Sequence, residues 1–419
     1  MLNIRLPLGV FCLFLRFSPL FLRCGKISVI TTVRGKRMDT IETRSLDRKR
    51  LLVFIAVAYG ISYLMMIPMY IGKQRGYDLT QIVDAQMCSP AAGVALGFLL
   101  FYKGEKLVPK FFMRVVVINY IIQLVLGLLS VLANPFGPDQ VFDLAQLLGI
   151  DGNSVALSGG QLSINLSQLY LMTGQYILII FSILMLIGYL VAGRKRRRFA
   201  GLSRNHEFRG LRLILLFIIL YLPRIFIPVI IDGLANNNLG EYISQYKELF
   251  KNPLLYASII SLPVNYPLTL IAFFGEEYGW RYFLQPIMQK KFGMRLGVIL
   301  LGIVWGLWHL PVDTMFYTED SVPQMIVGQI ITCVSLGIFL GYAYLKTNNI
   351  WICAAMHFLN NNLIPIVSGS FTADVVQNQT VTWIQLGEIL VLDLIIFCLF
   401  IFAKEYNEKK KTPEETVNA

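Results

Sequence analysis

The run LYLMTGQYILIIFSILMLIGYLVAG at residues 169–193 carries no charged side chain, and RKRRR at residues 194–198 follows it directly. A helix of about 20 apolar residues is long enough to cross the hydrocarbon core of a bilayer. Consecutive basic residues beside such a helix are typical of the cytoplasmic side of a membrane. This stretch therefore predicts a transmembrane helix whose C-terminal end lies in the cytoplasm.

The composition of all 419 residues extends this interpretation to the whole chain. Hydrophobic residues make up 56%, charged residues 15%, and the mean hydropathy is +0.61, whereas soluble domains contain about 25% charged residues. These values exclude an ordinary soluble enzyme, a nucleic-acid-binding domain and a disordered chain. Basic cytoplasmic loops account for the net charge of +12, so we expect the lipid bilayer as a partner and no nucleic acid.

Ten apolar runs in the sequence have the length of a membrane span. They predict an all-α fold, a polytopic membrane bundle of about ten transmembrane helices. The expected spans are Leu51–Ile71, Val83–Tyr102, Phe111–Ala133, Leu169–Gly193, Leu211–Ile231, Pro253–Gly275, Leu296–Phe316, Val322–Leu345, Ile350–Val367 and Val381–Ala403.

The charges between the spans predict the topology. With the N-terminus inside, the cytoplasmic segments hold 28 Lys and Arg residues and the outer segments hold 4. The loop 134–167 contains no basic residue and marks the outer side. Because basic residues collect in cytoplasmic loops, we expect an even number of spans with both chain ends in the cytoplasm.

The chain divides by composition into segments of different character. The first 37 residues resemble a signal-like leader or an over-long gene start, since Met38 opens a more ordinary N-terminus. The six cysteines form no CxxC pair, so neither a disulfide framework nor a cysteine zinc site is expected. The expected parts are a leader with a basic segment at 1–50, N-terminal spans at 51–250, a polar core at 253–367, a last span at 381–403 and a polar tail at 404–419.

Acidic residues continue the sixth span in the motif Glu276-Glu277-Tyr-Gly-Trp-Arg281. Glu277 and Arg281 are four residues apart, so they share a helix face and can form an ion pair. Glu276 is rotated by about 100° from Glu277 and can face another neighbour. Ionisable groups inside spans are costly and usually functional; the alternative is that both glutamates lie in water at the cytoplasmic helix end.

Two further motifs place histidines inside apolar spans. One is Trp305-Gly-Leu-Trp-His309, and the other is His357-Phe-Leu-Asn-Asn361, in which the histidine and the last asparagine share a helix face. The chain has three histidines, and the remaining one, His206, lies in a basic loop. A single buried histidine is usually a satisfied core residue, but two of them with an amide and a glutamate pair favour a functional site.

The depths of these groups in the membrane agree with one shared site. At a rise of 1.5 Å per residue, Glu276, His309, His357 and Asn361 can all reach one cavity that opens to the cytoplasm. Arg224 lies in mid-span between two prolines. Its role stays open between a counter-ion for a membrane acid and a contact with substrate.

The three motifs, in this order, resemble those of the CPBP family, which contains CAAX prenyl endopeptidases, bacteriocin-processing and bacteriocin-immunity proteins and abortive-infection-like proteins. The resemblance covers roughly residues 253–367. The family motif Glu-Glu-x-x-x-Arg is matched by Glu276, Glu277 and Arg281. The motif Phe-x-x-x-His is matched by Trp305 and His309, with tryptophan in place of phenylalanine. The motif His-x-x-x-Asn is matched by His357 and Asn361.

The resemblance implies an intramembrane endopeptidase that cuts a membrane-associated peptide or lipidated protein near its C-terminus. We expect an integral protein of the bacterial plasma membrane, with the active site facing the cytoplasm as the depths of the polar groups indicate. Glu276 and His309 can hold and deprotonate a water molecule. His357 and Asn361 can donate hydrogen bonds to the oxyanion.

The cofactor remains open between no metal and one divalent ion such as zinc. One glutamate and two histidines form a known catalytic zinc set, which here would be Glu276, His309 and His357. The sequence lacks the His-Glu-x-x-His signature of many zinc peptidases. The metal-free mechanism is therefore slightly favoured.

Two other classes of function fit part of the sequence. A bacteriocin-immunity or scaffold protein would keep this fold and bind a partner without proteolysis. A proton-coupled transporter would also have ten spans with buried acidic and basic groups, but no paired broken helices occur in matching halves. An intramembrane peptidase is the leading hypothesis.

Overall fold

The computed structural model describes residues 41–132, 141–143, 163–371 and 377–407. The predicted leader, most of the predicted outer loop 134–167 and most of the polar tail lie outside these described residues. Ten helices in the described part are long and apolar enough to cross a membrane. The all-α class and the expected number of spans are therefore confirmed.

The first half of the chain supplies four of these spans. Its only strands among the described residues are β1 and β2, which pair antiparallel with Val141 opposite Asn165. The elements are α2 (Ile41–Ile55), η1 (Ala56–Ile61), α3 (Ser62–Leu64), α4 (Met66–Gln74), α5 (Thr80–Phe101), α6 (Lys110–Leu132), β1 (Val141–Asp143), β2 (Ser163–Asn165), α9 (Leu166–Val191) and α10 (Gly193–Phe199).

The second half supplies the other six spans, several of them broken by short π-helical or 3-10 segments. These elements are α11 (Glu207–Ala235), α12 (Leu239–Lys251), α13 (Pro253–Glu277), η2 (Tyr278–Leu284), α14 (Gln285–Phe292), α15 (Met294–Trp308), α16 (Leu310–Val312), η3 (Asp313–Tyr317), α17 (Val322–Thr347), α18 (Ile350–Val367), α19 (Trp383–Ile396), η5 (Cys398–Phe402) and η6 (Lys404–Tyr406).

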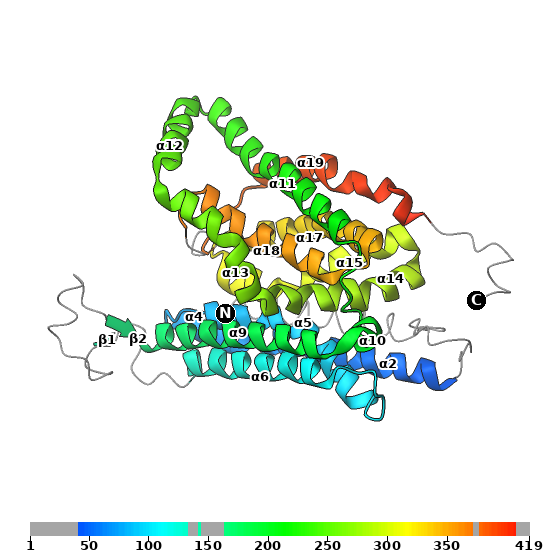
Figure 1. Cartoon of the computed structure of the whole chain (residues 1–419). Coiled ribbons are helices and arrows are strands. Elements are labelled where there is room, and N and C mark those ends of the chain that lie inside the picture. Colours follow the sequence, from blue (N-terminus) through cyan, green and yellow to red (C-terminus); the bar gives the residue numbers. More distant parts are fainter. Residues whose placement is uncertain (1–40, 133–140, 144–162, 372–376, 408–419) are drawn as a thin grey trace.

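Helix α13 lies at the centre of the bundle, between two groups of helices (Figure 1). On one side it contacts α5 and α9, with α6 packed behind them, and on the other side it contacts α18. Helices α17 and α15 pack together beside α18, and α11 and α19 form the outermost layer on that side (Figure 1). Side chains from both halves of the chain share one large hydrophobic core cluster.

The sixth span is longer than predicted, because it continues past Gly275 to Phe292. Gly275 and Gly279 do not end the helix but let it approach α5 closely. A Cβ atom on Gly275 would lie 2.5 Å from the carbonyl oxygen of Met87, and one on Gly279 would lie 2.3 Å from Cβ of Pro90. Small residues at such crossings allow tight helix packing in membranes, so this span carries its glutamates into the middle of the bundle.

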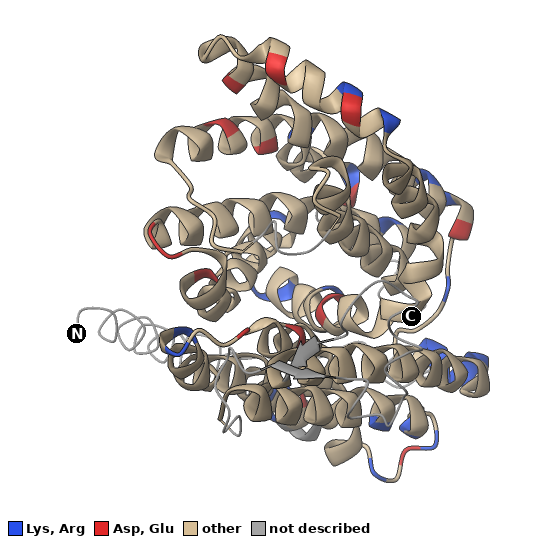
Figure 2. Ribbon diagram, turned by 90° about the vertical axis from the view of Figure 1, so that its left-hand side faces the viewer, with Lys and Arg blue, Asp and Glu red and all other residues tan. Residues whose placement is uncertain are grey.

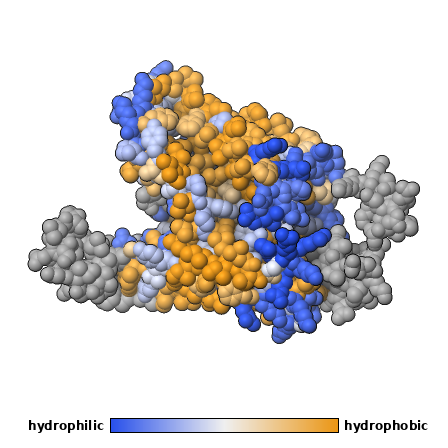
Figure 3. All heavy atoms as spheres, in the orientation of Figure 1, coloured by the Kyte–Doolittle hydropathy of each residue, from blue (hydrophilic) through white to orange (hydrophobic). Residues whose placement is uncertain are grey.

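Polar and apolar surfaces are separated along the helix direction. Hydrophilic atoms gather at the end of the bundle where α10 and α14 lie, and the surface between that end and α12 is largely hydrophobic (Figure 3). Seen along the helices from the α12 end, few charged residues interrupt the ribbons (Figure 2). This distribution agrees with the predicted basic side of the protein, while the cytoplasmic position of both chain ends stays a prediction.

Candidate active site within the membrane

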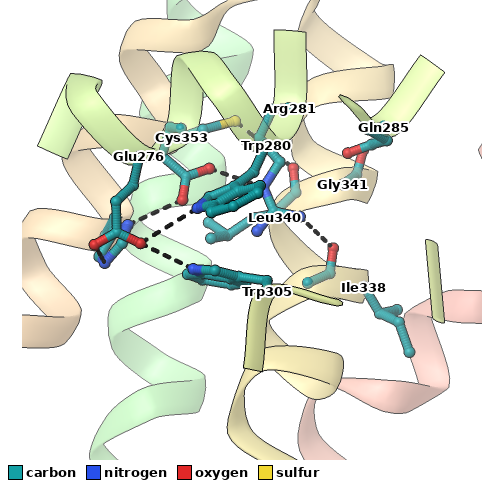
Figure 4. Close-up of polar contacts among 12 residues, drawn as sticks. Glu276, Trp280, Arg281, Gln285, Trp305, Ile338, Leu340, Gly341 and Cys353 are labelled. Carbon is teal, nitrogen blue, oxygen red and sulfur yellow. Dashed lines mark hydrogen bonds and ion pairs between the residues drawn. The ribbon is translucent and has the colours of Figure 1, made fainter. Parts of the chain in front are cut away.

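Glu276 occupies the last turn of α13 and is 2% exposed. Its Oε2 accepts hydrogen bonds from the indole Nε1 of Trp305 at 2.8 Å and of Trp280 at 3.4 Å (Figure 4). Its Oε1 lies 3.9 Å from Nε2 of His357. A buried carboxylate is costly unless donors satisfy it, so one oxygen is held by two indoles while the other faces an imidazole.

The predicted ion pair between Glu277 and Arg281 is present. The distance from Arg281 Nε to Glu277 Oε2 is 2.8 Å, and neither side chain is exposed. Arg281 Nη1 also donates to the carbonyl oxygen of Gly337 in α17 at 3.2 Å. The alternative in which both glutamates lie in water is wrong, because the continued helix buries them between its neighbours.

His357 in α18 joins the two glutamates. Its Nδ1 lies 2.9 Å from Oε1 of Glu277. A carboxylate paired with arginine accepts hydrogen bonds, so we infer that Nδ1 carries the hydrogen. The other ring nitrogen, Nε2, is then directed to Glu276 at 3.9 Å, which is longer than a direct hydrogen bond.

His309 follows α15 and lies beside the same cluster without a hydrogen bond to either glutamate. Its Nδ1 is 3.0 Å from the carbonyl oxygen of Trp305 and 3.7 Å from Sγ of Cys333. A carbonyl oxygen can only accept, so Nδ1 carries the hydrogen and Nε2 keeps its lone pair. The Trp305 ring is a neighbour of both histidines, with ring centroids 6.0 Å from His309 and 5.6 Å from His357.

Asn361 is exposed, and the hydrogen bond that it makes is to a neighbouring asparagine rather than to the glutamates or the imidazoles. Its Oδ1 accepts a hydrogen bond from Nδ2 of Asn360 at 2.8 Å. The hydrogens on Nδ2 of Asn361 therefore remain available for another acceptor. The structure brings Glu276, Glu277, Arg281 and His357 together, and the role of Asn361 at an oxyanion stays a prediction.

Asp84, Asp313 and Asp393 are among the acidic residues inside spans that the three motifs do not include, although the cost of burying a charge could have identified each of them. Asp84 of α5 accepts a hydrogen bond from Gln175 at 2.6 Å. Asp313 lies one turn beyond His309, and neither of its carboxyl oxygens has a hydrogen-bond partner among the described residues. The third, Asp393, belongs to a separate ion pair.

The residues considered for zinc are Glu276, His309 and His357. In the described ranges no group of three or more His, Cys, Asp or Glu side chains is placed to hold a metal ion. Hydrogen bonds occupy Oε2 of Glu276 and Nδ1 of each histidine, so Oε1 and the two Nε2 atoms are the ones that could hold an ion. The preference for a metal-free over a metal-dependent mechanism stays a prediction.

Arg224 forms an ion pair away from this cluster. Its Nε lies 2.6 Å from Oδ1 of Asp393 in α19, and its Nη2 donates to Oγ1 of Thr332 at 3.0 Å. Ser335 donates to Oδ2 of the same aspartate at 2.8 Å. Of the two roles left open for Arg224, the structure places it as the counter-ion of a membrane acid that holds α11, α17 and α19 together.

Replacing Arg224 by methionine is expected to lower the free energy of unfolding by about 3 kcal/mol. The cost arises because the change leaves the carboxylate of Asp393 buried without its partner. We place it at the lower end of the range for buried pairs because Arg224 is 12% exposed. Denaturation in detergent would measure this loss of unfolding free energy. The double variant Arg224→Met/Asp393→Leu is the control, because it removes both charges. A double variant as unstable as the single one would contradict this explanation.

Comparison with known proteins agrees with the position of the site. Residues 258–363 match the family described as type II CAAX prenyl endopeptidase Rce1-like. The chain is also 32% identical over 109 residues to CAAX prenyl protease 2 of Methanococcus maripaludis. This alignment covers 24% of the chain and 39% of that protein. No solved structure matches the chain.

The resemblance drawn from the three motifs is thereby confirmed for the segment that contains them. The matched residues 258–363 include both glutamates, Arg281, both histidines and Asn361. They lie within the predicted polar core at 253–367. The family match begins at residue 258, after the first five spans.

Proposed function

We propose that the protein is an intramembrane endopeptidase that hydrolyses a peptide bond of a membrane-associated substrate. The match of residues 258–363 to CAAX prenyl endopeptidases supports this proposal. The observation that carries it is the environment of Glu276, where two indole donors hold one carboxylate oxygen and leave the other 3.9 Å from an imidazole nitrogen. A fixed carboxylate beside an imidazole suits general acid–base catalysis.

In the proposed reaction, Oε1 of Glu276 takes a proton from a water molecule, and the resulting hydroxide adds to the carbonyl carbon of the scissile bond. His309 accepts a hydrogen bond from this water at Nε2. His357, as an imidazolium with a hydrogen on each ring nitrogen, donates from Nε2 to the oxyanion that forms, and Asn361 donates from Nδ2. Glu276 then returns the proton to the amine nitrogen as the carbon–nitrogen bond breaks. Glu277 and Arg281 keep His357 in place.

The proposed substrate is a membrane-anchored peptide or a lipidated protein cut near its C-terminus, approached from the cytoplasmic side of a bacterial plasma membrane. The relative named CAAX prenyl protease 2 supports a lipidated substrate. A bacteriocin precursor or a leader peptide has the same physical character, since each brings an extended peptide to the membrane surface. The peptides that accumulate uncut in cells carrying Glu276→Ala would identify the substrate.

The experiment uses the full chain in lipid vesicles, with a peptide that carries a lipid near its C-terminus. We expect mass spectrometry to detect the released C-terminal fragment, and release to continue when a strong chelator is present. Complete loss of release with the chelator, restored by zinc, would contradict the metal-free mechanism.

The same vesicles distinguish the other classes of function. If the protein cut no peptide, and if His309→Ala still protected cells against a bacteriocin or still bound its partner, the protein would be a bacteriocin-immunity or scaffold protein. A substrate flux coupled to protons across the vesicle membrane, without peptide release, would indicate a transporter. Either result would overturn the proposed peptidase.

A further inference from the structure

Glu276 depends on tryptophan for its hydrogen bonds. Among the described residues its two donors are the indoles of Trp305 and Trp280, whereas the hydrogen bonds of Arg281 go to Glu277 and to the carbonyl oxygen of Gly337. The bond from Trp305 is the shorter one, at 2.8 Å against 3.4 Å. Removing Trp305 Nε1 would leave Oε2 with one long contact inside the membrane.

The ring of Trp305 lies at the centre of the site and is 3% exposed. The guanidinium carbon of Arg281 is 4.8 Å from its centroid, and the rings of His309 and His357 approach it from α15 and α18. These neighbouring side chains fix the orientation of the indole ring. The direction of its N–H therefore determines which oxygen of Glu276 accepts the hydrogen bond.

We propose that Trp305 is a positioning residue for the reaction proposed above, and the inference rests on that proposed function. Its indole N–H holds Oε2 of Glu276, so that Oε1 alone is presented to the water and to His357. The family motif that this segment resembles has phenylalanine at this position, and phenylalanine offers no N–H. The hydrogen bond is thus a feature of this chain, beyond the motif.

The kinetic test is Trp305→Phe, which keeps an aromatic ring in the site and removes the donor. We expect kcat to fall about tenfold, as the loss of a hydrogen bond to a charged group predicts, and KM to stay within about twofold. Trp351→Phe is the matched control, because it removes an indole N–H that donates to the carbonyl oxygen of Leu202 at 3.0 Å, outside the site, and it should change kcat by less than about twofold. An unchanged kcat in Trp305→Phe, or a change confined to KM, would overturn the proposal.

A second variant covers the case in which phenylalanine disturbs folding. Incorporation of 3-benzothienylalanine at position 305 keeps the shape of the indole and replaces its N–H by sulfur. The same fall in kcat is expected as for Trp305→Phe. A fully active enzyme with this residue would show that only the ring is required, which overturns the proposed role of the N–H.

A spectroscopic measurement separates this inference from the proposed function. The chain has five tryptophans, so its indole N–H nuclear magnetic resonance spectrum is simple, and the Trp305 signal is the one that Trp305→Phe removes. We expect this signal to move upfield in Glu276→Gln, since a neutral amide accepts more weakly than a carboxylate. An unmoved signal would refute the contact. A moved signal, together with no peptide release by the original protein, would refute the proposed function alone.

Discussion

Replacing Glu276 by glutamine is expected to reduce peptide cleavage by about 10²- to 10⁴-fold, the usual contribution of a general base. Glutamine nearly matches glutamate in shape, and its carbonyl oxygen can still accept the indole hydrogen bond at 2.8 Å. What it lacks is a site that can take a proton from water. The loss should therefore appear in the rate of the chemical step, measured as peptide release from vesicles under single-turnover conditions.

The matched control for this prediction is Glu241→Gln, the same chemical change on the exposed helix α12. It should leave the rate within about twofold of the original protein. Both variants should reach the membrane in equal amounts, which immunoblotting of membrane fractions would check. Cleavage by Glu276→Gln at more than about a tenth of the original rate would contradict the assignment of Glu276 as the base.

Replacing Arg281 by methionine is expected to lower the free energy of unfolding by about 4–5 kcal/mol. The substitution leaves the carboxylate of Glu277 buried without its counter-charge, which is the costly way to break a buried pair. Neither partner is exposed to solvent, so the upper end of the range applies. Since a domain is stable by roughly 5–15 kcal/mol in total, this loss would remove a large share of the stability.

Thermal denaturation of the purified protein in detergent would measure this loss. The double variant Arg281→Met/Glu277→Gln removes both charges and should recover much of the stability, while the contact that holds His357 at 2.9 Å is weakened. Cleavage should therefore remain low in the double variant although its stability recovers. A single variant that loses less than about 1 kcal/mol would show that Glu277 finds another partner.

The largest difference between expectation and structure concerns how the site residues meet. The spacing of Glu277 and Arg281 correctly predicted their ion pair, because both partners lie on one helix. The spacing of His357 and Asn361 correctly placed them one turn apart, but only the histidine contacts the glutamates. The partner of Arg224 could not be identified in advance, since Asp393 lies 169 positions further along the chain.

Hydropathy and charge along the chain were sufficient to predict the ten helices of the described residues that are long and apolar enough to cross a membrane, because the need for apolar spans of about 20 residues acts on each segment separately. The motifs on two of those helices identified Glu276, Glu277, Arg281 and His357, which the structure brings together. Only the tertiary structure decided that two indoles hold Glu276, that His357 bridges both glutamates and that Arg224 pairs with Asp393. These contacts depend on how each helix is rotated and how closely its neighbours pack, and a linear pattern of residues does not contain that information.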